Sequence, residues 1–147
     1  MQIFQLLKSD HAEVKKMLQK ITETGGMKTR QKLFGALKEA LVAHTRAEQQ
    51  VFYRTLEDYD ETADMALEAE VEHEIVDRLL ADLSNMDVDP ERWSAKCKVL
   101  RELVEHHIKE EESEMFRLAR KVLDRKQIQE LGERFQSIKK QQLEPAA

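Results

Sequence analysis

The 147-residue chain carries 24 Lys and Arg against 29 Asp and Glu, and its formal charge of −5 argues against nucleic acid as the main partner. Charged residues make up 36% and hydrophobic residues 41%, a balance that is typical of a folded protein and not of a disordered one. Four Gly and two Pro are too few for the turns of an all-β fold, and a single cysteine excludes an intrachain disulfide framework.

The few chain breakers in the first half predict two long helices. Gly25-Gly26 ends the first of them, because glycine readily adopts the left-handed conformation that closes many helices. A polar stretch that contains Asp58 and Asp60 ends the second, and either aspartate can cap the helix that follows. We therefore expect helices over residues 2–24 and 28–57.

The second half contains one strong boundary and one weaker boundary. Asp89 can cap a helix that has Pro90 at its first position, where the fixed φ and the missing N–H of proline are tolerated. The weaker boundary lies near Asp124. We expect helices over 61–84 and 90–123 and a shorter one to about residue 142, all within one domain of residues 1–143 that is followed by a flexible tail over 144–147.

Each of the first four helices carries one apolar stripe at the 3.6-residue spacing of an amphipathic helix. Four such helices joined by short turns predict an all-α fold, an antiparallel up-down four-helix bundle, with the additional C-terminal helix packed on its outside. Six stripe positions carry a polar residue where leucine or valine is expected: His11, His44, Glu48, His73, His107 and Glu111.

Together, the six polar residues indicate a metal site. A single histidine on a core face is more often a hydrogen-bonded core residue than a ligand, and a single His–Glu pair at i, i+4 is usually a surface pair. Two carboxylates buried without compensation, however, cost on the order of several kcal/mol each. Four imidazoles beside two carboxylates instead suggest a shared first-row cation.

Distances along the chain place these residues at similar heights in the bundle. His44 and His73 lie about 15 and 14 residues from the turn at Asp58–Asp60, and the other turns give broadly similar separations for His11 and His107. At a rise of about 1.5 Å per residue, the largest difference in height along the bundle between residues on neighbouring helices is about 9 Å. Two metal ions about 3.5–4 Å apart can bridge that span. The economical interpretation is a dinuclear site with two histidines per metal and two carboxylates that contact both.

The pattern resembles that of the hemerythrin-like HHE cation-binding domains. The matching elements span nearly the whole chain to about residue 120, and they are Asp10-His11, His44-Thr-Arg-Ala-Glu48, Glu72-His73 and His106-His107-Ile-Lys-Glu-Glu111. The resemblance implies an antiparallel four-helix bundle that holds a non-heme di-iron centre, bridged by the two carboxylates and an oxo or hydroxo group. It also implies open coordination for dioxygen or another small molecule.

Two positions depart from the oxygen-carrying hemerythrins. Those proteins have a further histidine four residues after the ligand of the third helix, where this chain has Asp77, and their last carboxylate is an aspartate one residue beyond Glu111. The site therefore has four histidines and not five, which argues against reversible oxygen transport. We leave Asp77 out of the ligand set, because an aspartate there is more often solvated. His106 lies about 100° off the stripe, so we assign His107 as the ligand.

Other site patterns fit the sequence less well. The Glu-x-x-His motif of ferritin-like proteins occurs once, at Glu70–His73, and one copy does not make a site. The zinc-protease motif His-Glu-x-x-His fails because Asp77 replaces its second histidine. Cys97 has no second cysteine and no activating group nearby in the sequence, so we expect a structural thiol there.

We expect a non-heme di-iron protein that binds, senses or reacts with a small oxidant such as dioxygen, peroxide or nitric oxide. The alternatives are a di-iron enzyme of the catalase or peroxidase kind, and a protein that stores or delivers iron. Iron in preference to zinc or manganese follows from the resemblance, because His and Glu suit all three metals. No apolar run approaches the roughly 20 residues that cross a membrane, and residues 1–8 lack the features of a signal peptide. A cytoplasmic location is therefore expected, without a membrane or nucleic-acid partner.

Overall fold

The computed structural model describes residues 1–85 and 90–144, and this part of the chain contains no strand. In chain order its elements are α1 (Ile3–Glu23), α2 (Met27–Glu48), η1 (Gln49–Tyr53), α3 (Arg54–Leu56), α4 (Ala63–Asn85), α5 (Pro90–Glu110), η2 (Glu111–Met115), α6 (Phe116–Val122) and α7 (Arg125–Leu143). The two η elements are π-helical turns with helical backbone on both sides, so α2–η1–α3 and α5–η2–α6 each form one continuous rod.

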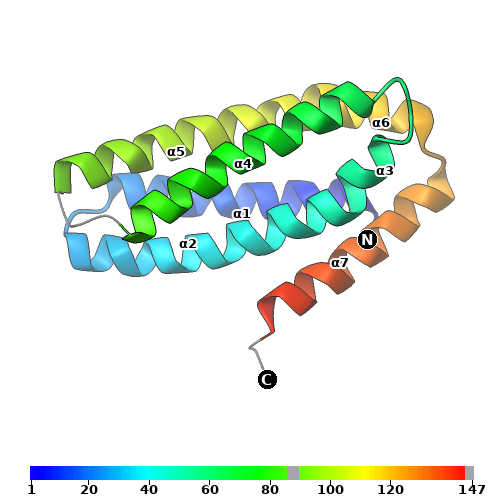
Figure 1. Cartoon of the computed structure of the whole chain (residues 1–147). Coiled ribbons are helices and arrows are strands. Elements are labelled where there is room, and N and C mark those ends of the chain that lie inside the picture. Colours follow the sequence, from blue (N-terminus) through cyan, green and yellow to red (C-terminus); the bar gives the residue numbers. More distant parts are fainter. Residues whose placement is uncertain (86–89, 145–147) are drawn as a thin grey trace.

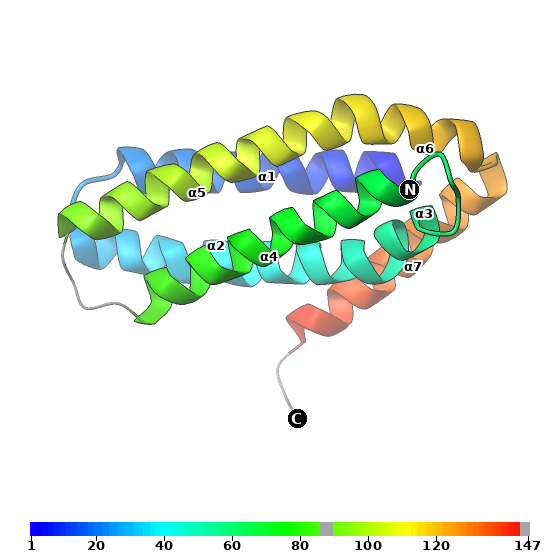
Figure 2. The ribbon, with the colours of Figure 1, turned by 45° about the horizontal axis from the view of Figure 1, so that its top comes forward.

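The four rods form an antiparallel bundle (Figure 1). Each rod packs beside the one before it, and α5 also packs beside α1, which closes the ring of neighbours. Figure 2 shows the same arrangement with α4 and α5 side by side in front of the rest. The expected all-α four-helix bundle with an additional C-terminal helix is therefore confirmed. Within the described ranges, none of the helices combines the length and the apolar character that a membrane crossing requires.

The turn between α1 and α2 contains a glycine with positive φ, but this glycine does not close α1 as the sequence predicts. Gly26 has a φ of 86°, a conformation that residues with a side chain rarely adopt. It stands directly before α2, whereas α1 ends at Glu23 and is followed by Thr24 in an extended conformation. The left-handed residue therefore sets the direction from which the chain enters the second helix.

The predicted caps of α4 were wrong. The helix begins at Ala63, so neither Asp58 nor Asp60 stands directly before it. Thr62 occupies that position, and its buried hydroxyl donates a hydrogen bond of 2.6 Å to the carbonyl oxygen of Leu56. This bond ties the start of α4 to the end of α3. The predicted cap at Asp89 lies outside the described residues, as do residues 145–147 of the predicted tail.

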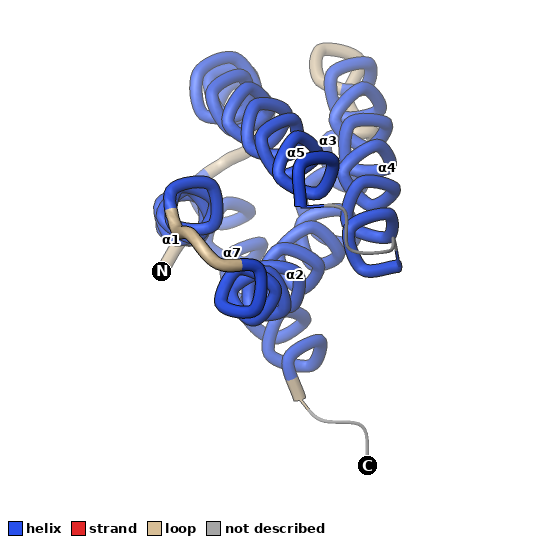
Figure 3. Tube along the Cα trace, turned by 90° about the vertical axis from the view of Figure 1, so that its left-hand side faces the viewer, coloured by secondary structure: helices blue, strands red, loops and turns tan. Residues whose placement is uncertain are grey.

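The C-terminal helix α7 lies outside the ring, along α1 and α2 (Figure 3). It begins at the predicted boundary with a capping box, in which Asp124 accepts from the N–H of Gln127 at 2.8 Å and the Gln127 side chain accepts in return at 2.9 Å. Gly132 lets the start of the chain approach closely, because a Cβ at this position would lie 2.4 Å from the carbonyl oxygen of Met1.

A polar layer divides the core into two apolar clusters. One cluster lies toward the turn between α3 and α4 and contains Phe52, and the other lies toward the turn between α1 and α2 and contains Trp93. On α1, Leu7 belongs to one cluster, Val14 belongs to the other, and the buried His11 stands between them. Since apolar side chains pack on both sides, polar groups in this layer need partners in the protein or a bound ion.

Candidate metal centre

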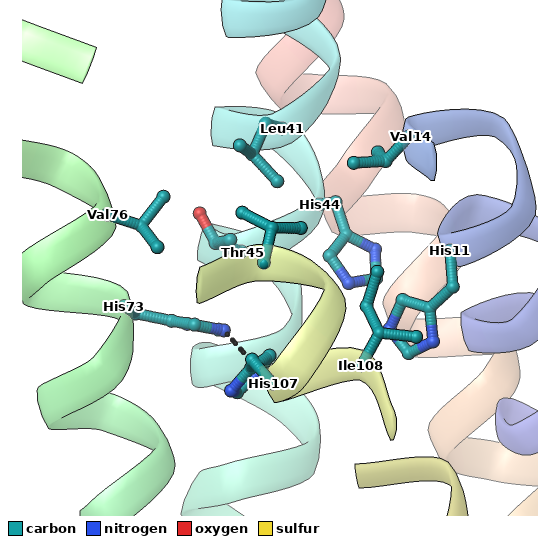
Figure 4. Close-up of a pocket in the computed structure, with 10 residues that line it drawn as sticks. His11, Val14, Leu41, His44, Thr45, His73, Val76, His107 and Ile108 are labelled. Atoms are coloured by element: carbon teal, nitrogen blue, oxygen red, sulfur yellow. Dashed lines mark hydrogen bonds between the residues drawn. The ribbon is translucent and has the colours of Figure 1, made fainter. Parts of the chain in front are cut away.

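All six residues that the sequence singles out meet in the polar layer, and each is at most 8% exposed. Figure 4 shows the four histidine side chains pointing into a common space between the helices. One residue comes from α1, two come from α2, one comes from α4 and two come from the α5–η2 rod: His11, His44, Glu48, His73, His107 and Glu111.

The donor atoms form two groups that share Glu48. The possible ligand atoms of His11, His44 and Glu48 lie within 4.8 Å of one another, and so do those of Glu48, His73 and His107. The Oε1 atom of Glu48 lies 3.5 Å from His44 Nε2 and 3.3 Å from His73 Nε2. One carboxylate thus faces a histidine of each pair.

Glu111 spans the same two groups from the opposite rod. Its Oε1 atom lies 3.4 Å from His11 Nε2, and its Oε2 atom lies 3.1 Å from His107 Nε2. Metal–ligand bonds to nitrogen and oxygen are about 2.0–2.2 Å long. When one ion binds two such atoms at an angle between the octahedral and the tetrahedral value, the two atoms lie about 3.0–3.5 Å apart. The spacings at both carboxylates match that range.

Several inward-facing atoms have no hydrogen-bond partner among the described residues. They are Nε2 of His11, Oε1 of Glu111 and both carboxylate oxygens of Glu48. A buried polar atom without a partner costs about 1–3 kcal/mol, and a charged one costs more. A cation between the two groups would give every one of these atoms a partner. The donor set and its orphaned atoms therefore fit a metal site.

The outward sides of three histidines are held by carboxylates. Each donates its Nδ1–H to an acidic residue on a different helix, and the pairs are His11 with Glu112 (2.7 Å), His44 with Asp10 (2.8 Å) and His107 with Glu72 (3.2 Å). A proton on Nδ1 leaves the Nε2 lone pair free and directed inward, which is the tautomer a metal ligand needs. The His73 Nδ1 atom has no partner within the described ranges.

Tyr53 belongs to the site although the sequence pattern did not identify it. Its fully buried hydroxyl donates to Oε2 of Glu111 at 2.5 Å and lies 3.0 Å from His107 Nε2 and 3.3 Å from His73 Nε2. Burial and the negative charge of Glu111 raise the pKa of the phenol well above its usual range. The only signal in the sequence was a hydroxyl-bearing ring close to a predicted ligand.

The π-helical turn η1 explains how Tyr53 reaches the site. Residues five apart in an α-helix point about 140° away from each other. In a π-helix the hydrogen bonds join residues five apart, so Glu48 and Tyr53 come close to one face. The turn η2 acts in the same way after Glu111, where Phe116 follows five residues later and stacks beside His11 with ring centroids 6.5 Å apart.

Protons bind strongly to the metal-free site. Burial disfavours the charged form of His44, but the negative charge of Glu48 and hydrogen bonding outweigh it and raise the pKa to about 10. Burial is likewise outweighed at His107, where hydrogen bonds with Glu111 raise the pKa to about 10. Burial also opposes ionisation of Glu48, yet the nearby polar groups of the layer and the positive charge of His44 hold its pKa well below the usual range. A metal must therefore displace protons when it binds.

An apolar cavity of about 20 Å³ adjoins the four histidines. This volume is close to what one water-sized molecule requires. Its other walls are mostly aliphatic and come from four helices, and the residues are Val14, Leu41, Thr45, Val76, Val104 and Ile108. A small, weakly polar molecule can therefore lie beside the histidines in largely aliphatic surroundings.

Three residues discussed from the sequence lie away from this centre. Asp77 is exposed on α4, and the His106 side chain is 62% exposed on α5. Their positions agree with leaving both out of the ligand set. Cys97 is buried in the apolar cluster that contains Trp93, and burial raises the pKa of its thiol to about 11, as expected for a structural cysteine.

Comparison with known proteins places the chain in a family. The chain is 24% identical over 149 residues to a DNA nickase from Nostoc sp. (strain PCC 7120 / SAG 25.82 / UTEX 2576), covering 95% of this chain but only 39% of that protein. Its fold matches the crystal structure of a hemerythrin HHE cation-binding domain-containing protein from Mycobacterium kansasii, with a TM-score of 0.84 and 24% identity over 97% of this chain and 88% of the other. The family model of the hemerythrin HHE cation-binding domain matches residues 2–119. The chain belongs to the hemerythrin HHE cation-binding domain family and is a metal-binding protein of the hemerythrin-like kind.

Proposed function

We propose that the chain binds two iron ions in the polar layer and reacts there with a small oxidant such as dioxygen, peroxide or nitric oxide. The observation that carries this proposal is the position of the two buried carboxylates. Glu48 faces His44 and His73, and Glu111 faces His11 and His107. Each carboxylate therefore stands between two histidine pairs, as ligands shared by two ions must.

The contacts support a proposed division of the ligands between two positions. His11 and His44 would hold one ion, His73 and His107 would hold the other, and both glutamates would contact both. The likeness to hemerythrins supports iron, since these donors alone also suit manganese and zinc. When bound, such ions supply Lewis acidity and electrons for reaction with the oxidant.

The protein's own residues provide the environment for that chemistry. The cavity beside the histidines has room for one small molecule, and its other walls are mostly aliphatic. The Tyr53 hydroxyl keeps its proton, because its pKa lies well above the usual range, and it can donate a hydrogen bond within the layer. The outer carboxylates fix the imidazole rings, which limits rearrangement during a reaction.

Metal stoichiometry tests the first part of the proposal. Titration of the metal-free chain with ferrous ion under nitrogen should reach its end point at about two equivalents. The variant Glu48→Gln removes the negative charge that both groups share, so it should weaken binding of both equivalents. Asp77→Asn removes an exposed carboxylate from α4 and should leave the titration unchanged. An end point at one equivalent, or equal effects of the two variants, would contradict the two-ion site.

Reaction of the ferrous-loaded protein with each oxidant tests the second part. A stoichiometric spectral change that reverses on removal of the oxidant supports a binding or sensing role. Sustained evolution of oxygen from peroxide supports a catalase-like enzyme, and rapid transfer of iron to a chelator without either reaction supports iron storage or delivery. If all three oxidants react with the loaded protein no faster than with free ferrous ion, the proposed oxidant chemistry is wrong.

A further inference from the structure

A second pocket, of about 280 Å³, lies between α4 and the α5–η2 rod. Figures 1 and 2 both show these two rods side by side. Five glutamates line the pocket, two from α4 and three from the α5–η2 rod: Glu68, Glu72, Glu110, Glu111 and Glu114. Glu114 is paired with the exposed Arg117, Glu110 with His106 and Glu72 with His107, and acidic side chains still outnumber basic ones in the pocket lining.

The inner end of this pocket is formed by the metal layer itself. His107 and Glu111 line the pocket together with the surface glutamates. Glu111 is only 1% exposed, and its Oε1 atom has no hydrogen-bond partner among the described residues. The pocket therefore extends from exposed carboxylates at the surface to two residues of the metal layer.

The outer rim carries a separate group of possible metal ligands. Donor atoms of Glu72, His106 and Glu110 lie within 4.8 Å of one another, and His106 Nε2 is 3.2 Å from Glu110 Oε1. One imidazole and two carboxylates suit divalent first-row metals. Glu72 joins the rim to the interior, because its Oε1 atom accepts the Nδ1–H of His107 at 3.2 Å.

Two other pockets near the site have lysine as well as acidic side chains in their walls. The pocket that reaches His44 from the side of α7 is lined by Lys139 as well as by acidic residues. A further pocket, between α1 and the α5–η2 rod, is lined by three lysines: Lys8, Lys15 and Lys109. A cation approaching either opening meets a lysine ammonium group, whereas no lysine or arginine lines the pocket beside α4 among the described residues.

We infer that Glu72, His106 and Glu110 form a surface capture site for divalent transition-metal cations, and that the acidic pocket behind them is the route by which a cation reaches His107 and Glu111. This inference rests on the proposed function, because it needs a metal destination in the layer. Charge in a cleft focuses the electric field and raises association rates of oppositely charged ligands about 10–1,000-fold. The route therefore controls how fast metal loads, and the inner ligands control how much metal is held.

Loading kinetics separate the route from the destination. Co²⁺ is the probe, since its visible bands report binding in the buried layer and it does not oxidise during the measurement. Metal-free protein is mixed with Co²⁺ in a stopped-flow instrument at two salt concentrations. The test variant is Glu68→Gln with Glu110→Gln in the acidic pocket, and the charge-matched control is Glu13→Gln with Glu39→Gln in the pocket beside α7. His106→Gln is measured alone.

The pocket double variant should load about tenfold more slowly than the unchanged chain at low salt, and the difference should shrink at high salt. His106→Gln should slow loading about threefold or more, and the control double variant should slow it much less. All variants should reach the same final amount of Co²⁺ in the buried layer, because none of the substituted residues belongs to its six proposed ligands.

Equal slowing by the two double variants would overturn the route, and an unchanged rate for His106→Gln would overturn the capture site. Failure of the unchanged chain to bind Co²⁺ in the buried layer is a different result. It would remove the proposed metal function and the inference together.

Discussion

Asp10 shows how a single residue can tie the metal layer to the rest of the protein. Its Oδ2 atom accepts from His44 Nδ1 at 2.8 Å, and its Oδ1 atom accepts from Lys139 of α7 at 2.5 Å. These bonds fix the ring of His44 and stabilise the ionised carboxyl, whose pKa they lower against the opposing effect of burial. Asp10 therefore acts on the site through His44 without facing the inner space.

The variant Asp10→Asn should weaken metal binding about 10–100-fold while the helical fold is retained. The amide keeps the shape of the side chain but removes the charge that supports His44. Competition with a coloured chelator measures the affinity. Asp77→Asn, an exposed change on α4, is the control and should have no effect. Equal affinities for the two variants would show that the hydrogen bond at 2.8 Å does not support the metal site.

Tyr53→Phe removes one hydroxyl from the layer and leaves the ring in place. Because the lost group is a proton donor at Glu111, the reaction of the loaded protein with peroxide should slow about 100-fold, while metal stoichiometry stays the same. Stopped-flow absorption follows the reaction. Tyr59→Phe is the control, since the Tyr59 hydroxyl contacts Gln127 at 3.1 Å, outside the metal layer. A peroxide rate that Tyr53→Phe leaves unchanged would exclude a role for the hydroxyl.

The residue scale also shows what sequence reasoning can reach. The six stripe residues could be predicted, because a polar side chain on an apolar helix face is visible in the pattern itself. The outer carboxylates could not be assigned in the same way. Asp10 adjoins His11 in the sequence but holds His44, and Glu72 adjoins His73 but holds His107. Such partners depend on which helices become neighbours, and one sequence does not contain that information.

At the scale of the elements, the helices were predicted within a few residues, whereas their internal irregularities were not. Scarce glycine and proline mark the ends of rods, as at Gly26 and Pro90. No residue type is specific to a π-helical turn, so η1 and η2 could not be predicted from the spacing of apolar residues. These turns rotate Tyr53 and Phe116 toward the site, which is why the stripe did not include the tyrosine.

Two glycines give a matched test of how α7 is held. Gly132→Ala should lower the free energy of unfolding by about 1–3 kcal/mol, because the new Cβ would press on the backbone of Met1 at 2.4 Å. Gly35→Ala, in an exposed part of α2 with no atom within 4 Å of the new Cβ, should raise it by up to about 1 kcal/mol. Urea unfolding measures both. If the two changes have the same sign, the close contact between α7 and the chain's first residues is wrong.

At the scale of the whole molecule, the polar layer lies between two apolar clusters and places charged groups inside the core. In the metal-free chain, protons on histidines compensate the charges of the buried glutamates. Because the folded-state pKa of His44 and of His107 is about 10, above the ordinary value of about 6.5, protonation stabilises the fold. A bound metal replaces these protons, so metal binding and folding stability are coupled.

The coupling predicts a characteristic pH dependence. The contribution of His44 and His107 is fully present below about pH 6.5 and is lost as the pH rises through about 10, so the metal-free chain should lose a few kcal/mol across this window. In the metal-loaded chain the same imidazoles are already deprotonated, and stability should change little there. Thermal unfolding at a series of pH values compares the two forms. Parallel curves for both forms would contradict the coupling.

The central claim is that four histidines and two glutamates hold two iron ions between the helices. Metal analysis of the chain purified without added metal, together with its visible absorption spectrum, tests this most directly. The account predicts about two irons per chain and the charge-transfer bands of a bridged ferric pair, both lost in the variant His73→Ala. One zinc ion per chain with a featureless visible spectrum would contradict it.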